Sequence, residues 1–172
     1  VDEILYLEDD MVQVRFINKY GTDTYDLTKE FVDNNGLKEN MLIEWYYDLF
    51  TEDPIRIHEK YDLSGNPDSW QTDNESYTST AATGFYRADK IVYRDGDAVQ
   101  FMVNGELTDL MPMNQYPCVY ELVSVGGKNK LVENKGSNPL GYINQGDDVW
   151  FKLLTWGPEP RSVGIVIYDK RS

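Results

Sequence analysis

Glu44 is the acidic residue with the most aromatic surroundings in the chain, in the segment Met41-Leu42-Ile43-Glu44-Trp45-Tyr46-Tyr47. A glycosidase needs two carboxyl groups at a suitable separation, and aromatic rings commonly line its sugar-binding cleft. One hypothesis is therefore a small glycoside hydrolase centred on Glu44. The alternative is an outward-facing Glu44 on a strand whose Trp45 or Tyr46 belongs to the core.

The same segment is similar to the nucleophile strand of the small jelly-roll xylanases, in which a Glu precedes paired tyrosines. This similarity implies a nucleophilic role for Glu44. It covers only residues 41–47, and no matching acid strand is identified elsewhere in the chain. We therefore assign no family from it.

Other catalytic arrangements have less support. His58 is the only histidine, on the polar side of Ile55–Lys60, and no nucleophile signature surrounds the single cysteine, Cys118. We interpret Cys118 as a small buried hydrophobic residue. Gly126-Gly127 lacks the Lys-Ser/Thr of a phosphate-binding loop. The chain is predicted not to be an enzyme, or to be a glycosidase if it is one.

Calcium is the ion that the composition favours, because only oxygen ligands are abundant. The candidates are Asp62 and Asp68 in one loop and Asp95 and Asp97 in another. Neither loop has the spacing of a helix-loop-helix calcium site. The alternative is that these are turn residues whose carboxylates accept from their own backbone. No other cofactor is expected.

Four aromatic residues are candidates for sugar stacking or protein contact. Trp70 and Tyr77 lie in a long polar segment, residues 64–84, whereas Tyr116 and Trp156 lie in proline-stiffened connections, Met111–Pro117 and Trp156–Arg161. Loops of such length are usually functional or mobile. For Trp70 the alternative is a ring that folds back and fastens its loop to the body of the protein.

Apolar residues recur with a period of two, which indicates half-buried strands. Three such patterns begin at Val12, Ile55 and Val99, and the third runs into Asn104-Gly105, a dipeptide that favours a tight hairpin turn. Denser apolar runs predict central strands at Cys118–Val125, Val149–Leu154 and Val163–Tyr168. Two further runs predict similar strands at Ile4–Leu7 and Met41–Phe50.

One helical turn is predicted at Thr28–Asp33, with Asp26 or Thr28 as its N-cap and Gly36 as its end. Frequent Gly-containing turns separate the strands. The predicted fold is therefore all-β: a single domain over residues 1–172, formed by an antiparallel β-sandwich that is jelly-roll-like and carries long loops.

Residues 145–168, Gly-Asp-Asp-Val-Trp-Phe followed by Val-Gly-Ile-Val-Ile-Tyr, resemble the closing hairpin of the trimeric jelly rolls of the complement-head and tumour-necrosis-factor type. In that family these strands lie near the sandwich core, and three subunits pack about an axis. The resemblance implies a jelly roll that assembles into an oligomer.

The charge excludes whole classes of partner. With 16 basic and 30 acidic residues the net charge is −14, and residues 1–86 carry six basic and 19 acidic side chains. Nucleic-acid binding needs a basic stripe, which is absent. No apolar run is long enough to span a membrane.

These observations predict a non-enzymatic structural or attachment protein that acts through protein-protein contacts. Examples are a virion decoration or fibre-type subunit and a cell-surface subunit, and we expect a homo-oligomer or larger assembly on an extracellular or virion surface. The first alternative is a carbohydrate-binding module or lectin that binds glycans through loop aromatics. The second is the small glycosidase.

Overall fold

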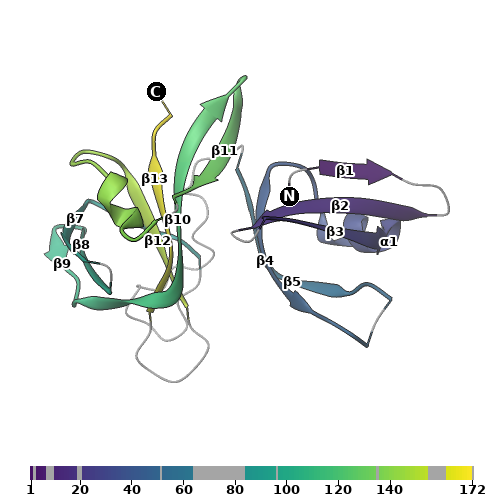
Figure 1. Cartoon of the computed structure of the whole chain (residues 1–172), viewed down its shortest axis with the longest axis horizontal. Helices are drawn as coiled ribbons and strands as arrows, with labels where there is room; N and C mark the ends of the chain where they lie inside the picture. Colours follow the sequence, from purple (N-terminus) through teal and green to yellow (C-terminus); the bar gives the residue numbers. More distant parts are fainter. Residues whose placement is uncertain are drawn as a thin grey trace. The chain divides into compact units, whose positions relative to one another are not determined.

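A computed structural model gives the architecture of the chain (Figure 1). It describes residues 1, 3–6, 10–18, 21–50, 52–63, 84–95, 97–134, 136–154 and 162–171. The described chain is mostly strand in largely antiparallel sheets, so the all-β prediction is confirmed. Four predicted site residues lie outside the described residues: Asp68, Trp70, Tyr77 and Trp156.

The chain divides into two compact units, unit 1 from Val1 to Gly65 and unit 2 from Asn66 to Ser172. Each has its own cluster of buried apolar side chains. The single domain expected from the sequence stays a prediction, and the two units are described separately below.

Unit 1 contains a three-stranded antiparallel sheet, a short helix and a hairpin. The elements are β1 (Glu3–Tyr6), β2 (Met11–Asn18), β3 (Gly21–Thr28), α1 (Lys29–Asn35), β4 (Met41–Tyr47) and β5 (Ile55–Asp62). Val12, Val14 and Phe16 are buried from one face of β2, as their alternation predicted. Ile55 of β5 and Val32 of α1 belong to the same core cluster.

Helix α1 confirms the predicted helical turn. The Thr28 hydroxyl accepts a hydrogen bond from the Phe31 backbone N–H at 3.1 Å, so Thr28 is the N-cap. The helix ends at Gly36, whose φ of 59° lies in the left-handed region that glycine enters without a Cβ clash.

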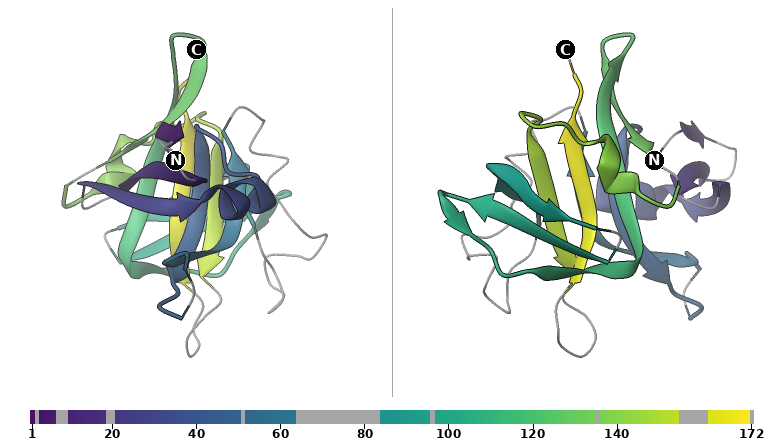
Figure 2. Two further views of the ribbon diagram at one scale, coloured as in Figure 1. Left: turned by 90° about the vertical axis from the view of Figure 1, so that its right-hand side faces the viewer. Right: turned by 60° about the vertical axis from the view of Figure 1, so that its left-hand side comes forward.

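Unit 2 is built on an eight-stranded sheet that curls into a half-barrel (Figure 2). Its main path has the order β6-β12-β13-β10-β8-β7, with β11 beside β10 and β9 beside β8. The bounds are β6 (Tyr86–Ala88), β7 (Lys90–Arg94), β8 (Ala98–Val103), β9 (Glu106–Leu107), β10 (Met111–Val125), β11 (Lys128–Glu133), η2 (Pro139–Tyr142), β12 (Val149–Leu154) and β13 (Ser162–Asp169). The predicted jelly-roll-like sandwich stays a prediction.

The hairpin predicted at Asn104-Gly105 is confirmed. Strand β8 pairs with β9 through Met102 and Leu107, and both turn residues have positive φ, 52° and 78°. Asn and Gly tolerate this backbone conformation better than other residues, which explains why so short a signal identified the turn.

The segment Met111–Pro117 corrects a prediction, because it forms the first half of β10 rather than a connection. The strand pairs with β8 at Met111 and Pro112 and with β13 at Met113 and again from Cys118 onward, after a shift of register. Prolines lack the N–H donor of a regular ladder and are tolerated where pairing is interrupted. The β10–β13 pair is parallel, unlike the antiparallel pairing expected throughout.

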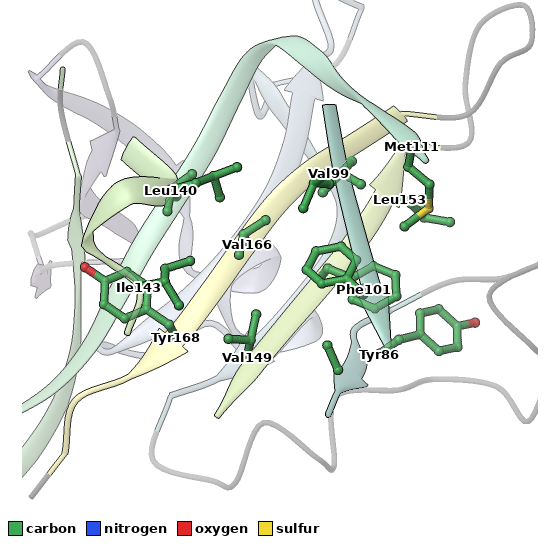
Figure 3. Close-up of a cluster of buried hydrophobic side chains, with 14 residues drawn as sticks. Tyr86, Val99, Phe101, Met111, Leu140, Ile143, Val149, Leu153, Val166 and Tyr168 are labelled. Atoms are coloured by element: carbon green, nitrogen blue, oxygen red, sulfur yellow. The ribbon is translucent and has the colours of Figure 1, made fainter. Parts of the chain in front are cut away.

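The core of unit 2 lies on one face of this curled sheet (Figure 3). Phe101 of β8 and Phe151 of β12 are both fully buried, and their rings stack with centroids 4.4 Å apart and an interplanar angle of 8°. Stacked rings combine a large buried apolar area with close packing. This pair joins strands that lie three positions apart in the sheet order.

We therefore expect Phe101→Ala to lower the free energy of unfolding by about 3–5 kcal/mol, because it leaves a cavity beside Phe151. Urea denaturation followed by circular dichroism measures the change. The control is Leu110→Ala, at a side chain that is 57% exposed, which should alter stability by less than about 0.5 kcal/mol. Equal effects of the two substitutions would contradict the assigned core.

Candidate functional site

The most exposed large apolar side chains of the described chain lie at the turn of the β4–β5 hairpin. Phe50 is 100% exposed and Leu49 83% exposed, and Tyr46 and Tyr47 at the end of β4 are 48% and 63% exposed. We call these four residues the apolar tip. Of the four, Leu49 and Phe50 are consecutive loop residues, and large exposed apolar patches commonly mark interaction sites.

The sequence analysis placed Leu49 and Phe50 in a strand over Met41–Phe50, but β4 ends at Tyr47. Asp48 ends it. Its backbone N–H donates to the Pro54 carbonyl at 2.8 Å, and its carboxylate accepts from the Phe50 N–H at 3.1 Å. This side-chain turn directs the chain away from the strand.

Hydrogen bonds to charged groups hold the hairpin loop at both ends. The Asp48 carboxylate lies 3.3 Å from Nε of Arg56 on β5. Asp53 accepts from the Thr28 backbone N–H at 2.7 Å and from the Thr28 hydroxyl at 3.0 Å. The loop is thereby fastened to the N-cap of α1, and the apolar tip projects from an ordered support.

Aromatic rings from three strands support the base of the tip. Tyr47 meets Trp45 edge-on, with centroids 5.0 Å apart, and Trp45 meets Tyr25 of β3 at 5.4 Å. The Tyr25 hydroxyl donates to that of Tyr47 at 3.2 Å. Burial, and then this hydrogen bond, raises the pKa of Tyr25. Phe16 of β2 completes the group.

A shallow groove of about 510 Å³ adjoins the same loop, since Glu52 is one of its lining residues. Its other described acidic residues are Asp10, Glu30 and Asp33, and Lys29 is the one basic residue among the described residues that line it. Asp33 is 2.7 Å from Lys29. The surface beside the apolar tip is therefore acidic.

The structure places Glu44 on β4, partly buried, directly opposite Glu59 of β5. The register shifts immediately after this pair. The Tyr61 hydroxyl donates to the Glu59 carboxylate, and burial, followed by this bond, raises the pKa of Tyr61. Sequence reasoning missed Glu59, because cross-strand partners depend on the hairpin register. Two opposed carboxylates are one requirement of a glycosidase, and they do not by themselves assign this activity.

The calcium candidates that the structure describes are engaged locally. Asp62 lies 2.5 Å from Nζ of Lys38. Asp95 accepts from the backbone N–H groups of Asp97 and Ala98 at 2.7 and 2.8 Å. These hydrogen bonds are those expected of a turn residue, which was the alternative to a calcium ligand. Among the described residues no group of three or more His, Cys, Asp or Glu side chains could hold a metal ion.

The other predicted residues are distributed over separate strands. Cys118 is partly buried on β10, where burial and then the neighbouring Cys118 raise the pKa of Tyr120. Tyr116 also belongs to β10, and His58 is exposed on β5. Within the described ranges, no helix has both the length and the apolar composition needed to cross a membrane.

Comparison of this chain with protein-family models, with curated proteins and with solved structures gives no match. The assignment of function therefore depends on the geometry of the described residues alone.

We expect Asp53→Ala to destabilise the chain by about 1–3 kcal/mol, because it removes both acceptors of the Thr28 N–H and hydroxyl. Asp53→Asn, which retains one carbonyl oxygen, should cost less. Urea denaturation measures stability, and hydrogen exchange at the Leu49 and Phe50 amides reports the loop. Glu52→Ala is the control at an exposed neighbour. Unchanged exchange in Asp53→Ala would show that the loop does not need this anchor.

Three hydrogen bonds lower the pKa of Asp95, the largest effect being that of the Tyr93 hydroxyl at 2.7 Å. Because the folded-state pKa is below that of an unfolded Asp, these bonds stabilise the fold above the unfolded pKa, and this contribution is lost as pH falls through the folded pKa. Tyr93→Phe should raise the pKa of Asp95 in a carboxyl ¹³C NMR titration. Tyr142→Phe, at an exposed tyrosine on η2, should leave it unchanged.

Proposed function

We propose that this chain is a non-enzymatic structural or attachment protein that acts through protein-protein contacts, with the apolar tip as its contact surface. The observation that carries the proposal is the full exposure of Phe50 beside the 83% exposed Leu49, at a turn that Asp48 and Asp53 hold in place.

Energetics support a contact role for these side chains. Burial of one Phe or Leu side chain contributes about 1.5–3 kcal/mol, and the core of unit 1 receives none of this from Leu49 or Phe50. At an interface the same two side chains would be central anchors. Because Asp48 and Asp53 already hold the two ends of the loop, less conformational entropy would be lost when a partner binds.

The net charge of unit 1 indicates which class of partner the apolar tip would bind. Unit 1 contains 16 acidic and six basic side chains, a net charge of −10. Such a surface repels nucleic acids and anionic lipid headgroups and attracts basic proteins. The proposal includes an oligomeric, jelly-roll-like subunit on an extracellular or virion surface, as the sequence analysis expected.

Glycan binding is the second candidate, and one observation favours it. The Tyr47 ring is 63% exposed, and its hydroxyl lies 3.2 Å from that of Tyr25. An exposed ring beside two hydroxyls combines a stacking surface with hydrogen-bonding groups. The fully apolar Leu49 and Phe50 at the end of the tip suit a protein partner better, because sugars offer few purely apolar surfaces.

Photo-crosslinking tests the proposal. Phe50 is replaced by the photo-reactive residue benzoylphenylalanine, and the chain is irradiated both alone and in an extract of the cells that produce it. We expect covalent adducts with polypeptide at a yield several-fold above that from Tyr142, a 61% exposed control position on unit 2. Mass spectrometry of the adducts identifies the contacted peptide.

A yield at position 50 no higher than at position 142 would contradict the proposal. An array of immobilised glycans, probed with the wild-type chain and with Tyr47→Ala, distinguishes glycan binding from protein contact. Retention that Tyr47→Ala abolishes, without protein adducts from position 50, would favour glycan binding instead.

A further inference from the structure

We propose that the partner of the apolar tip is a second copy of this chain, which presents its β10–β11 hairpin to the tip. This inference rests on the proposed function and identifies the partner of the same surface. The hairpin projects from its sheet, and its apolar and charged side chains are complementary to those around the tip.

The β10–β11 hairpin projects from the sheet of unit 2. The last paired residues of β10 and β13 are Leu122 and Asp169, whereas β10 continues to Val125 and turns through Gly126-Gly127. Figure 2 shows the hairpin extending beyond the end of β13. Among the described strands, β11 pairs only with β10. The end of this hairpin is the surface that we assign to the contact with a second copy.

One face of this hairpin is both apolar and basic. Residues that pair directly across two antiparallel strands lie on the same face, and so do alternate residues of one strand. Val123 pairs with Lys130, and Val125 with Lys128. Val132 shares this face. Val125 and Val132 are 61% and 44% exposed. Toward its turn, the face thus presents Val123 and Val125 beside two exposed lysines, and at its other end Val132 lies opposite the partly buried Glu121.

The surface around the tip has the complementary composition. Leu49 and Phe50 provide apolar groups, and Glu30 and Glu52 line the adjoining acidic groove. None of the ion pairs among the described residues uses Glu30, Glu52, Lys128 or Lys130. Opposite charges that form no ion pair with other described residues can attract one another across an interface and fix its register.

Charge repulsion also disfavours contacts in which two copies present the same surface to each other. Two tips would bring acidic grooves together, and two β11 edges would bring Lys128 and Lys130 against their own copies. Lysines on an edge strand oppose such strand-to-strand pairing. The favoured contact joins two different surfaces, so each copy offers one tip and one hairpin. Repetition of such a contact produces a closed ring or an open filament.

Paired charge reversals test the inference. Variant A is Lys128→Glu with Lys130→Glu, and variant B is Glu30→Lys with Glu52→Lys. All four positions are exposed, so melting temperatures should stay close to that of the wild type. Sedimentation velocity from micromolar to millimolar protein measures assembly, and crosslinks from position 50 locate the contact.

We expect the wild type to assemble with rising concentration, more weakly at high salt. Variant A alone and variant B alone should each associate about tenfold or more weakly, because like charges then face one another. An equimolar mixture of A and B should assemble again, since each tip meets an oppositely charged hairpin. Lys130→Glu alone should also weaken assembly, whereas its control Lys90→Glu, at an exposed lysine on β7, should assemble like the wild type.

A wild type that stays monomeric over the whole range overturns the inference, as does a mixture that fails to reassemble. Crosslinks from position 50 to a different protein or to a different segment of a second copy also overturn it, but they leave the proposed protein-contact function standing. If position 50 gives no adduct at all, both the inference and the proposed protein-contact function are contradicted.

Discussion

The carboxylate of Asp53 joins the two parts of unit 1 on which the candidate site depends. It accepts from both the N–H and the hydroxyl of Thr28, and the same hydroxyl accepts from the Phe31 N–H at the start of α1. One side chain therefore connects the hairpin loop to the helix cap. Because the loop is held at Asp48 as well, its apolar residues project outward although the core offers them no contact.

Strand β10 has the corresponding role in unit 2. It pairs with β8 at its start and with β13 and β11 later, so one continuous strand crosses between two parts of the sheet. The change of partner occurs between Pro112, which pairs with β8, and Met113, which pairs with β13, and the register with β13 then shifts between Met113 and Cys118. The long strand then passes the end of β13, and this continuation produces the projecting hairpin (Figure 1).

Acidity and exposed apolar groups coincide in unit 1, which has 16 acidic and six basic side chains, whereas the charges of unit 2 are closer to balance, with 14 acidic and ten basic side chains. An acidic surface keeps a protein soluble and prevents non-specific association. It also favours basic surfaces over acidic ones as partners, because opposite charges attract. The proposed contact uses this selectivity, because apolar anchors supply affinity and charge supplies orientation.

The sequence alone determined the features that depend on near neighbours. Alternation identified the strands at Val12 and Ile55, Asn104-Gly105 identified a turn, and Thr28 with Gly36 identified the limits of α1, because backbone preferences act over a few residues. Only the tertiary structure decided that Glu59 faces Glu44 and that Leu49 and Phe50 are left exposed. Cross-strand register and burial depend on which distant segments pack together, and no local pattern encodes that choice.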